Sequence, residues 1–171
     1  MSLAYRSAQF LRALTARPGP EDLALADEFL PAGLRSVFRR LPRADQAHGL
    51  TVLRRLLARG ERHPDLLAAG LLHDLGKARH PLRLWERVVI VLARRLAPPS
   101  VQRWAKAPPS GWRRPFVVAG LHPAWGAEII RKAGGSPTLV NLILHHQVDS
   151  SQPDSPVDPL LRSLRLADGD S

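Results

Sequence analysis

The segment that most constrains this chain is DLLAAGLLHDLGK, residues 65–77. Its residues 66–72 are all apolar or glycine, so a helix through them would be apolar on every side and would have to be buried on every side. His73 and Asp74 follow directly. An ionised side chain taken out of water costs several kcal/mol unless a group of opposite charge meets it. The fold must therefore bring such a partner to this pair.

Composition favours a helical protein. The chain has 171 residues, of which 44% are hydrophobic and 5% aromatic. A chain of this length can bury a sizeable core as one domain, and its abundant Leu, Ala and Arg favour helix over strand. We therefore expect an all-α fold, a single compact domain of about six to eight helices.

Prolines and glycines divide the sequence into helix-sized pieces. Asp45 is expected to N-cap one helix, and Pro123 to stand in the first turn of another. Residues 97–115 contain two Pro-Pro pairs and are expected to be the least regular segment, a long connection anchored by Trp104 and Trp112 or a lid or contact loop. A polar loop is expected over residues 149–156. The expected helices cover residues 2–17, 21–30, 33–41, 45–59, 64–72, 82–96, 123–133, 138–147 and 158–171.

Charge and cysteine content bear on the partners. The chain has 25 Lys and Arg against 15 Asp and Glu, a formal charge of +10, and it has no cysteine for a disulfide or a thiolate metal site. Because Arg occurs as singles and pairs, we interpret it as solvated surface and expect no nucleic acid as partner, although such a surface attracts small anionic substrates. No aliphatic run approaches the ~20 residues of a membrane span, and we predict no signal peptide. We expect a cytoplasmic protein with no membrane partner.

Helix periodicity places further polar side chains on inner faces. Asp168 follows Leu164 by four residues, and His146 follows Leu142 by four, so both lie on apolar stripes. His145 lies about 100° round the helix from His146, nearer the edge of the stripe, so periodicity favours His146 as the inward residue. His48 and His122 are also expected at or near inner faces. Taken alone, each histidine suits a neutral, hydrogen-bonded core or cap residue, and Asp168 suits a cap or a salt bridge to an arginine.

Together these residues indicate a metal site, because several buried polar groups become inexpensive if they converge on cations. Imidazole nitrogen and carboxylate oxygen without sulfur suit divalent Fe, Mn, Co, Ni or Zn. Two ions about 3.5 to 4 Å apart would use all seven ligands, and such pairs catalyse phosphate-ester hydrolysis. A single ion is the alternative, with the later histidines contacting phosphate. The seven candidates are His48, His73, Asp74, His122, His145, His146 and Asp168.

The order of these motifs resembles the HD-domain phosphohydrolase superfamily, whose members are all-helical. The metal-binding signature of that superfamily is matched by His48, His73-Asp74 and Asp168, in the contexts DQAHGLTVL, AAGLLHDLGK and LADGD. The segments LHPAWGAEI and LILHHQ are similar to those that supply the extra histidines of its binuclear branch, which includes HDIG-type members. The Gly-Tyr-Pro motif of the cyclic-di-GMP phosphodiesterases is absent, and we find no counterpart of the acidic pair of the (p)ppGpp hydrolases.

The resemblance implies a first ion held by His48, His73, Asp74 and Asp168 and a second held by Asp74, His122, His145 and His146. It implies an HD-type domain over residues 33–171, with the N-terminal helices of residues 1–32 packed on it. The implied activity is metal-dependent hydrolysis of a phosphomonoester or phosphodiester, on a nucleotide or a related small phosphate ester, by a metal-activated hydroxide.

Two candidate catalytic residues follow from the same resemblance. Asp74 would bridge the two ions, and Lys77 could hold a phosphate oxygen. Lys77 equally suits a solvated lysine near the C-terminal end of a helix. The alternative function is a sensor that binds metal and a nucleotide without turnover.

Overall fold

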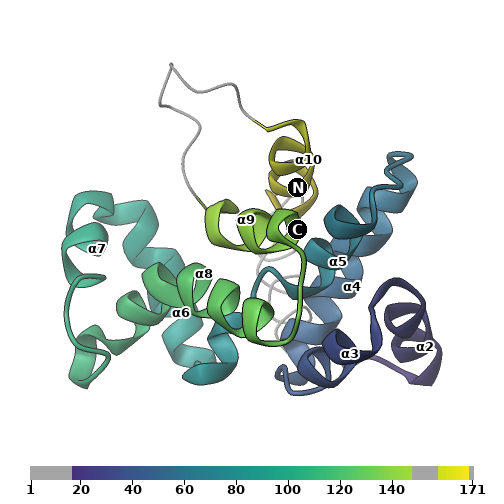
Figure 1. Ribbon diagram of the computed structural model, residues 1–171. Coiled ribbons are helices and arrows are strands. Elements are labelled where there is room, and N and C mark those ends of the chain that lie inside the picture. Colours follow the sequence, from purple (N-terminus) through teal and green to yellow (C-terminus); the bar gives the residue numbers. More distant parts are fainter. Residues whose placement is uncertain (1–16, 148–157, 170–171) are drawn as a thin grey trace, which may run out of the picture.

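The computed structural model describes residues 17–147 and 158–169, and its described part is helical without any strand (Figure 1). This confirms the all-α prediction, with nine α-helices and two 3₁₀ helices among the described residues. The helices are α2 (Pro20–Phe29), α3 (Ala32–Phe38), α4 (Arg43–Ala58), α5 (Pro64–Leu72), η1 (Leu75–Arg79), α6 (Leu84–Leu96), α7 (Pro98–Trp104), η2 (Gly111–Arg113), α8 (Arg114–Lys132), α9 (Pro137–His145) and α10 (Pro159–Gly169).

Helix α5 is the buried centre of the fold, as its sequence predicts. Every residue from Leu66 to Leu72 is buried, and α5 contacts α2, α4, α9 and α10. Its last residue is followed by His73 at the C-cap and Asp74 at the start of η1. The apolar helix therefore delivers the polar pair to the interior.

Glycines let α4 approach α5 closely. A Cβ on Gly49 would lie 2.6 Å from the carbonyl oxygen of Leu71, and a Cβ on Gly70 would lie 2.9 Å from the Cδ1 of Leu56. A side chain at Gly49 would hold the helices apart, because it would meet the backbone of α5, whereas at Gly70 the Leu56 side chain would have to move. The close crossing brings His48 of α4 within reach of His73.

Asp45 does not cap α4, and that prediction is wrong. The helix begins at Arg43, after Pro42. Asp45 is instead buried, and both of its carboxylate oxygens accept hydrogen bonds from Arg87 of α6, at 2.7 and 3.0 Å. A tertiary partner 42 residues away outweighs the local preference of Asp for a helix start.

Pro123 does not open a helix either, because α8 runs through it from Arg114 to Lys132. A proline inside a helix removes the N–H that would donate to the carbonyl four residues earlier, here that of Ala119. In this fold Nδ1 of His122 lies 3.1 Å from that carbonyl oxygen. His122 therefore stands in the middle of a long helix, and the hydrogen bond from its ring offsets part of the cost of the proline.

Residues 97–115 are more regular than predicted, since they contain α7 and η2. Trp104 anchors the segment, with its ring centroid 4.8 Å from that of Phe116, while Trp112 is largely exposed. Ser136 N-caps α9, because its side chain accepts a hydrogen bond from the N–H of Leu139.

Some predictions fall outside the described residues. These are the helix over residues 2–17, apart from Arg17, and the polar loop over residues 149–156. The division into residues 1–32 and 33–171 stays a prediction. No helix in the described part of the chain combines the length and the apolar character needed to cross a bilayer.

Candidate metal centre

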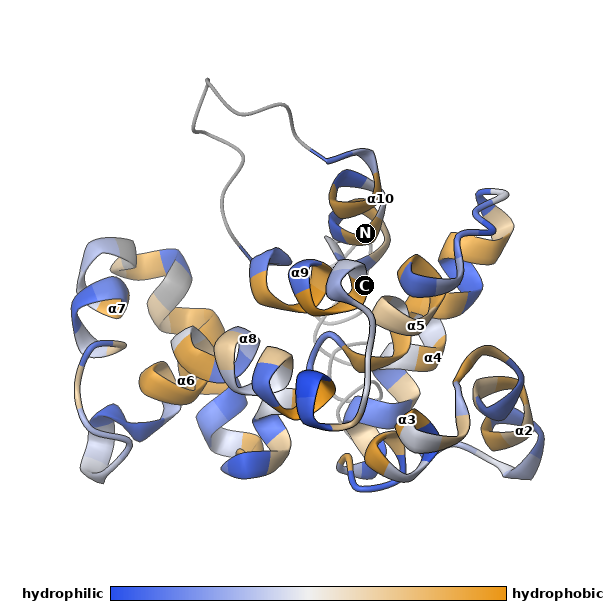
Figure 2. Ribbon diagram, viewed as in Figure 1, coloured by the Kyte–Doolittle hydropathy of each residue, from blue (hydrophilic) through white to orange (hydrophobic). Residues whose placement is uncertain are grey.

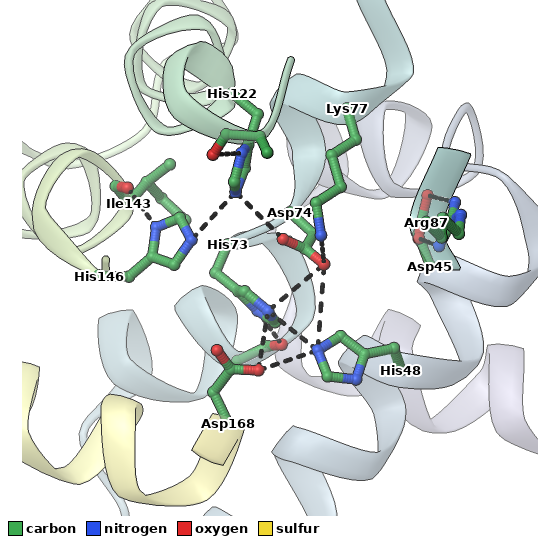
Figure 3. A network of polar contacts seen from close by, with 12 residues as sticks. Asp45, His48, His73, Asp74, Lys77, Arg87, His122, Ile143, His146 and Asp168 are labelled. Atoms are coloured by element: carbon green, nitrogen blue, oxygen red, sulfur yellow. Dashed lines mark hydrogen bonds and ion pairs between the residues drawn. The ribbon is translucent and has the colours of Figure 1, made fainter. Parts of the chain in front are cut away.

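Six of the seven predicted ligands converge on one point in the interior (Figure 3). Each comes from the middle, the end or the flank of a different helix, so the site exists only in the folded chain. They are His48 of α4, His73 after α5, Asp74 before η1, His122 of α8, His146 after α9 and Asp168 of α10.

The first group of ligands is built around His48 and His73. Their Nε2 atoms are 3.2 Å apart. The Oδ1 of Asp168 lies 3.0 Å from Nε2 of His48 and 3.5 Å from Nε2 of His73. The Oδ2 of Asp74 lies 3.9 and 3.7 Å from the same two nitrogens.

The second group consists of His122, His146 and Asp74. The Nε2 atoms of the two histidines are 3.3 Å apart, and Oδ1 of Asp74 lies 3.3 Å from Nε2 of His122. Asp74 thus turns one carboxylate oxygen toward each group, as Figure 3 shows. A carboxylate in this position can bridge two cations.

Three of the four histidines have their Nδ1 atoms held by backbone carbonyls. Nδ1 of His73 bonds to Gly70 at 3.1 Å, that of His122 to Val118 at 3.1 Å, and that of His146 to Ile143 at 2.7 Å. A carbonyl oxygen can only accept, so each Nδ1 carries the proton and donates. In a neutral ring Nε2 is then an unprotonated lone pair, which is the form that binds metal.

The positions of these lone pairs show whether a metal ion fits between the ligands. In their neutral forms His122 and His146 face each other with no proton between their Nε2 atoms, so the 3.3 Å contact is repulsive unless a cation lies between them. Ligand atoms bound at 2.0 to 2.1 Å to one ion are about 2.8 to 3.0 Å apart in octahedral geometry and about 3.3 to 3.4 Å apart in tetrahedral geometry. The closest contacts within the two groups, 3.0 to 3.5 Å, agree with that spacing. The residues therefore fit divalent metal ions.

Comparison of the sequence with models of protein families matches the HD domain over residues 47–171, well over half of the chain. The chain belongs to the HD domain family. Members of this family are generally metal-dependent phosphohydrolases, and the matched stretch includes all seven predicted ligands. No curated protein and no solved structure matches the chain.

Burial keeps the two histidines of the second group of this HD domain neutral. It lowers the pKa of His146 to about 3, with smaller contributions from His73 and His122. It also lowers the pKa of His122, against the opposing effect of Asp74. Both rings therefore present lone pairs at neutral pH, as metal binding requires.

The first group carries charge. Burial alone would lower the pKa of His73, but Asp74 and Asp168 outweigh it and raise that pKa to about 9. Burial would raise the pKa of Asp74, yet Lys77 and the histidines hold it well below its usual range. The pKa of Asp168 is likewise lowered, because His48 and His73 outweigh the effect of burial. In the metal-free protein a proton on His73 thus meets the carboxylates, and a bound cation would replace it.

Lys77 and His145 are not members of the two ligand groups, but Lys77 contacts a ligand of both. Nζ of Lys77 donates to Oδ2 of Asp74 at 2.6 Å, so Lys77 touches the shared carboxylate. His145 directs its Nδ1 to the carbonyl of Asn141 at 3.1 Å and belongs to neither group. Its role as a ligand stays a prediction from the family resemblance.

Two positioning residues were not predicted. A Cβ on Gly76 would lie 1.9 Å from the carbonyl oxygen of His122, so only glycine lets η1 sit against α8 at this point. The guanidinium of Arg165 in α10 donates to the carbonyls of His145 and His146, at 2.8 and 3.2 Å, and so ties the end of α9 to the helix that carries Asp168. Gly76 stands within the HDLGK motif, a signal that could have been used, whereas Arg165 is one of many arginines.

Proposed function

We propose that this HD domain is a metal-dependent phosphohydrolase acting on a nucleotide or a related small phosphate ester. The observation that carries the proposal is the position of Asp74, with one carboxylate oxygen toward His48 and His73 and the other toward His122. Two histidine groups that share a carboxylate suit a pair of divalent ions such as Fe, Mn, Co, Ni or Zn. The second group is also what supports placing the chain in the binuclear, HDIG-type branch.

Different residues of the chain have different roles in the proposed hydrolysis. Two ions, when bound, would supply an activated water at neutral pH and positive charge for the phosphoryl oxygens. Backbone carbonyls fix the ring orientation of His73, His122 and His146, so the ligand atoms are placed before any metal or substrate arrives. His48 and Asp168 are partly exposed, so we infer that the phosphate ester approaches from their side.

Positive charge around the site favours an anionic substrate. Lys77 lies 2.6 Å from Asp74, and Arg87 is close enough to feel the charge of the same carboxylate. The chain as a whole carries a formal charge of +10. Such a field attracts phosphate esters and, at the site, would stabilise charge that develops on their oxygens. A nucleotide is the substrate class that this charge and the family resemblance suggest together.

The test combines metal analysis with turnover. We expect purified protein, prepared both aerobically and anaerobically, to contain about two transition-metal ions per chain. It should hydrolyse a chromogenic phosphodiester or phosphomonoester with added Mn, lose that activity to a chelator, and regain it when Mn is restored. A panel of nucleotides, followed by chromatography, then identifies the substrate.

Two results would contradict the proposal. Protein that holds no metal after either preparation would remove its basis. Protein that holds metal and binds nucleotides without hydrolysing any ester in the panel would be a sensor instead.

A further inference from the structure

The outer face of α6 is apolar, although it faces solvent. Eight large hydrophobic side chains are exposed in the described part of the chain, and five of them belong to this one helix. Figure 2 shows hydrophobic stretches along α6, which lies with α7 toward the end of the molecule opposite α2 and α3. The five are Leu84, Trp85, Val91, Leu92 and Leu96.

These side chains form one continuous face. At 100° per residue, the five residues together with Val88 fall within an arc of about 140°. Arg95 is the only charged residue in that arc. The other side of α6 carries Glu86 and Arg87, which pair with Arg114 and Asp45 of the protein interior. The inner side of α6 also packs Ile90 against Phe116, so the helix is largely apolar on both sides and the outer arc has no partner in the described part of the chain.

The same region holds most of the net charge. Residues 83–114 contain eight Arg or Lys and one acid, Glu86, and so carry +7 of the chain's formal +10. Within the region Glu86 pairs with Arg114, and Arg87 pairs with the buried Asp45, so the surface charge comes from the remaining cations. Among the described side chains of the region, the exposed cations are Arg83, Arg95, Arg103, Lys106 and Arg113.

We propose that the outer face of α6 docks on the surface of an anionic lipid bilayer. A helix lying in the interface buries its apolar arc at the boundary of headgroups and acyl chains, while long cationic side chains reach back to lipid phosphates. Trp85 supplies the aromatic side chain that such interfaces favour. The cations would pair with the anionic headgroups, and the Leu and Val side chains would be buried in the acyl layer.

Two other occupants fit the face less well. A nucleic acid would neutralise the cations but leave an arc of leucine and valine in water. A second copy of this chain would cover the arc but would bring two sets of exposed cations together, which opposes association. The earlier expectation of no membrane partner considered only spans of ~20 residues, and a helix that lies on a bilayer needs no such span.

The test is flotation of the full chain with two kinds of vesicle. One kind is phosphatidylcholine alone, and the other is phosphatidylcholine with phosphatidylglycerol at about 2:1, both at ~150 mM salt. We expect binding to the anionic vesicles only. The double variant Trp85→Gln, Leu92→Gln should bind roughly tenfold more weakly or worse, because it removes two of the five exposed apolar side chains, including the tryptophan.

Leu166→Gln is the matched control, since Leu166 of α10 is 51% exposed and Leu92 is 52% exposed. It should bind like the wild type. Thermal unfolding of all three proteins shows whether they are folded, and the flotation assay needs no turnover. The proposal is overturned if the wild-type protein binds neither kind of vesicle. It is also overturned if the double variant and the control lose binding equally. A wild-type dimer that the double variant converts to monomer, without vesicle binding, would assign the face to self-association instead.

Discussion

The two ligand groups that share Asp74 differ in how far they are buried. His122 and His146 are 0% and 5% exposed, whereas the side chains of His48 and Asp168 are 28% and 35% exposed. The second group is closed by packing, and the first lies at an opening. The comparison suggests a division in which the closed group fixes the geometry and the open group meets the substrate.

The closed group owes its geometry to close backbone contacts. Gly76 of η1 sits against the backbone of α8 at His122, and a Cβ on Gly126 of α8 would lie 3.2 Å from the backbone nitrogen of Gly76. The open group depends on Asp168, which lies one residue before the end of α10. Backbone packing holds atoms more firmly than a side chain near a helix end, so we expect the two groups to respond differently to substitution.

Asp74→Ala should have the largest effect, because it removes the carboxylate that both groups share. We expect metal content to fall from about two ions toward none, and hydrolysis to drop roughly 10³-fold or more, as the loss of several kcal/mol of transition-state stabilisation requires. Metal analysis and steady-state kinetics measure both. Asp65→Asn, at the start of the same α5 segment and outside the two groups, is the control. A variant with full activity would show that the groups do not function as one site.

Gly76→Ala should break the closed group alone. Its new Cβ would lie 1.9 Å from the His122 carbonyl, so η1 and α8 must separate, at a cost of about 1 to 3 kcal/mol in the free energy of unfolding. We expect a lower melting temperature, and we expect the ion of the closed group to be lost before that of the open group. Gly19→Ala is the control, since its Cβ would have no neighbour nearer than 3.8 Å. Wild-type stability and metal content in Gly76→Ala would contradict the role of this contact.

His145 and His146 are adjacent at the end of α9, but only His146 belongs to the closed group. His146→Gln removes a ligand atom of the closed group, and we expect it to lower metal content by about one ion per chain. His145→Gln removes a ring whose Nδ1 bonds to Asn141, so its effect on metal content should be smaller. Equal losses in the two variants would show that both histidines bind metal, as the family resemblance implies.

Helix periodicity predicted the centre of the site well because the inner faces are continuous. The segment 66–72 could only be buried, and it is. His146 lies four residues after Leu142 and is buried with it, as the spacing indicates. Where a residue's environment is set by its own helix, the sequence contains the information needed.

Contacts between residues far apart in the sequence limited the prediction of other features of the fold. Asp45 is suited to an N-cap, but in the fold it is buried in an ion pair with Arg87. No local sequence pattern indicates that ion pair. Pro123 is suited to the first turn of a helix, but in the fold it lies inside one. The His122 ring donates a hydrogen bond to the carbonyl that lacks its usual donor because of the proline. The contact of Gly76 with α8 joins segments almost fifty residues apart in the sequence. Each of these depends on how helices meet, which local propensity does not specify.

Lys77→Gln should have the smallest effect and tests the open side of the comparison. If Lys77 contacts a phosphate oxygen, kcat/KM falls roughly 10- to 100-fold while metal content stays near two ions, because one charge near the developing negative charge is lost. Lys77→Arg should restore part of the activity. Lys132→Gln, which removes an exposed lysine paired with Glu128, is the control. If kcat/KM is unchanged in Lys77→Gln, the lysine only balances Asp74, and its 2.6 Å ion pair is then a feature of the metal-free protein.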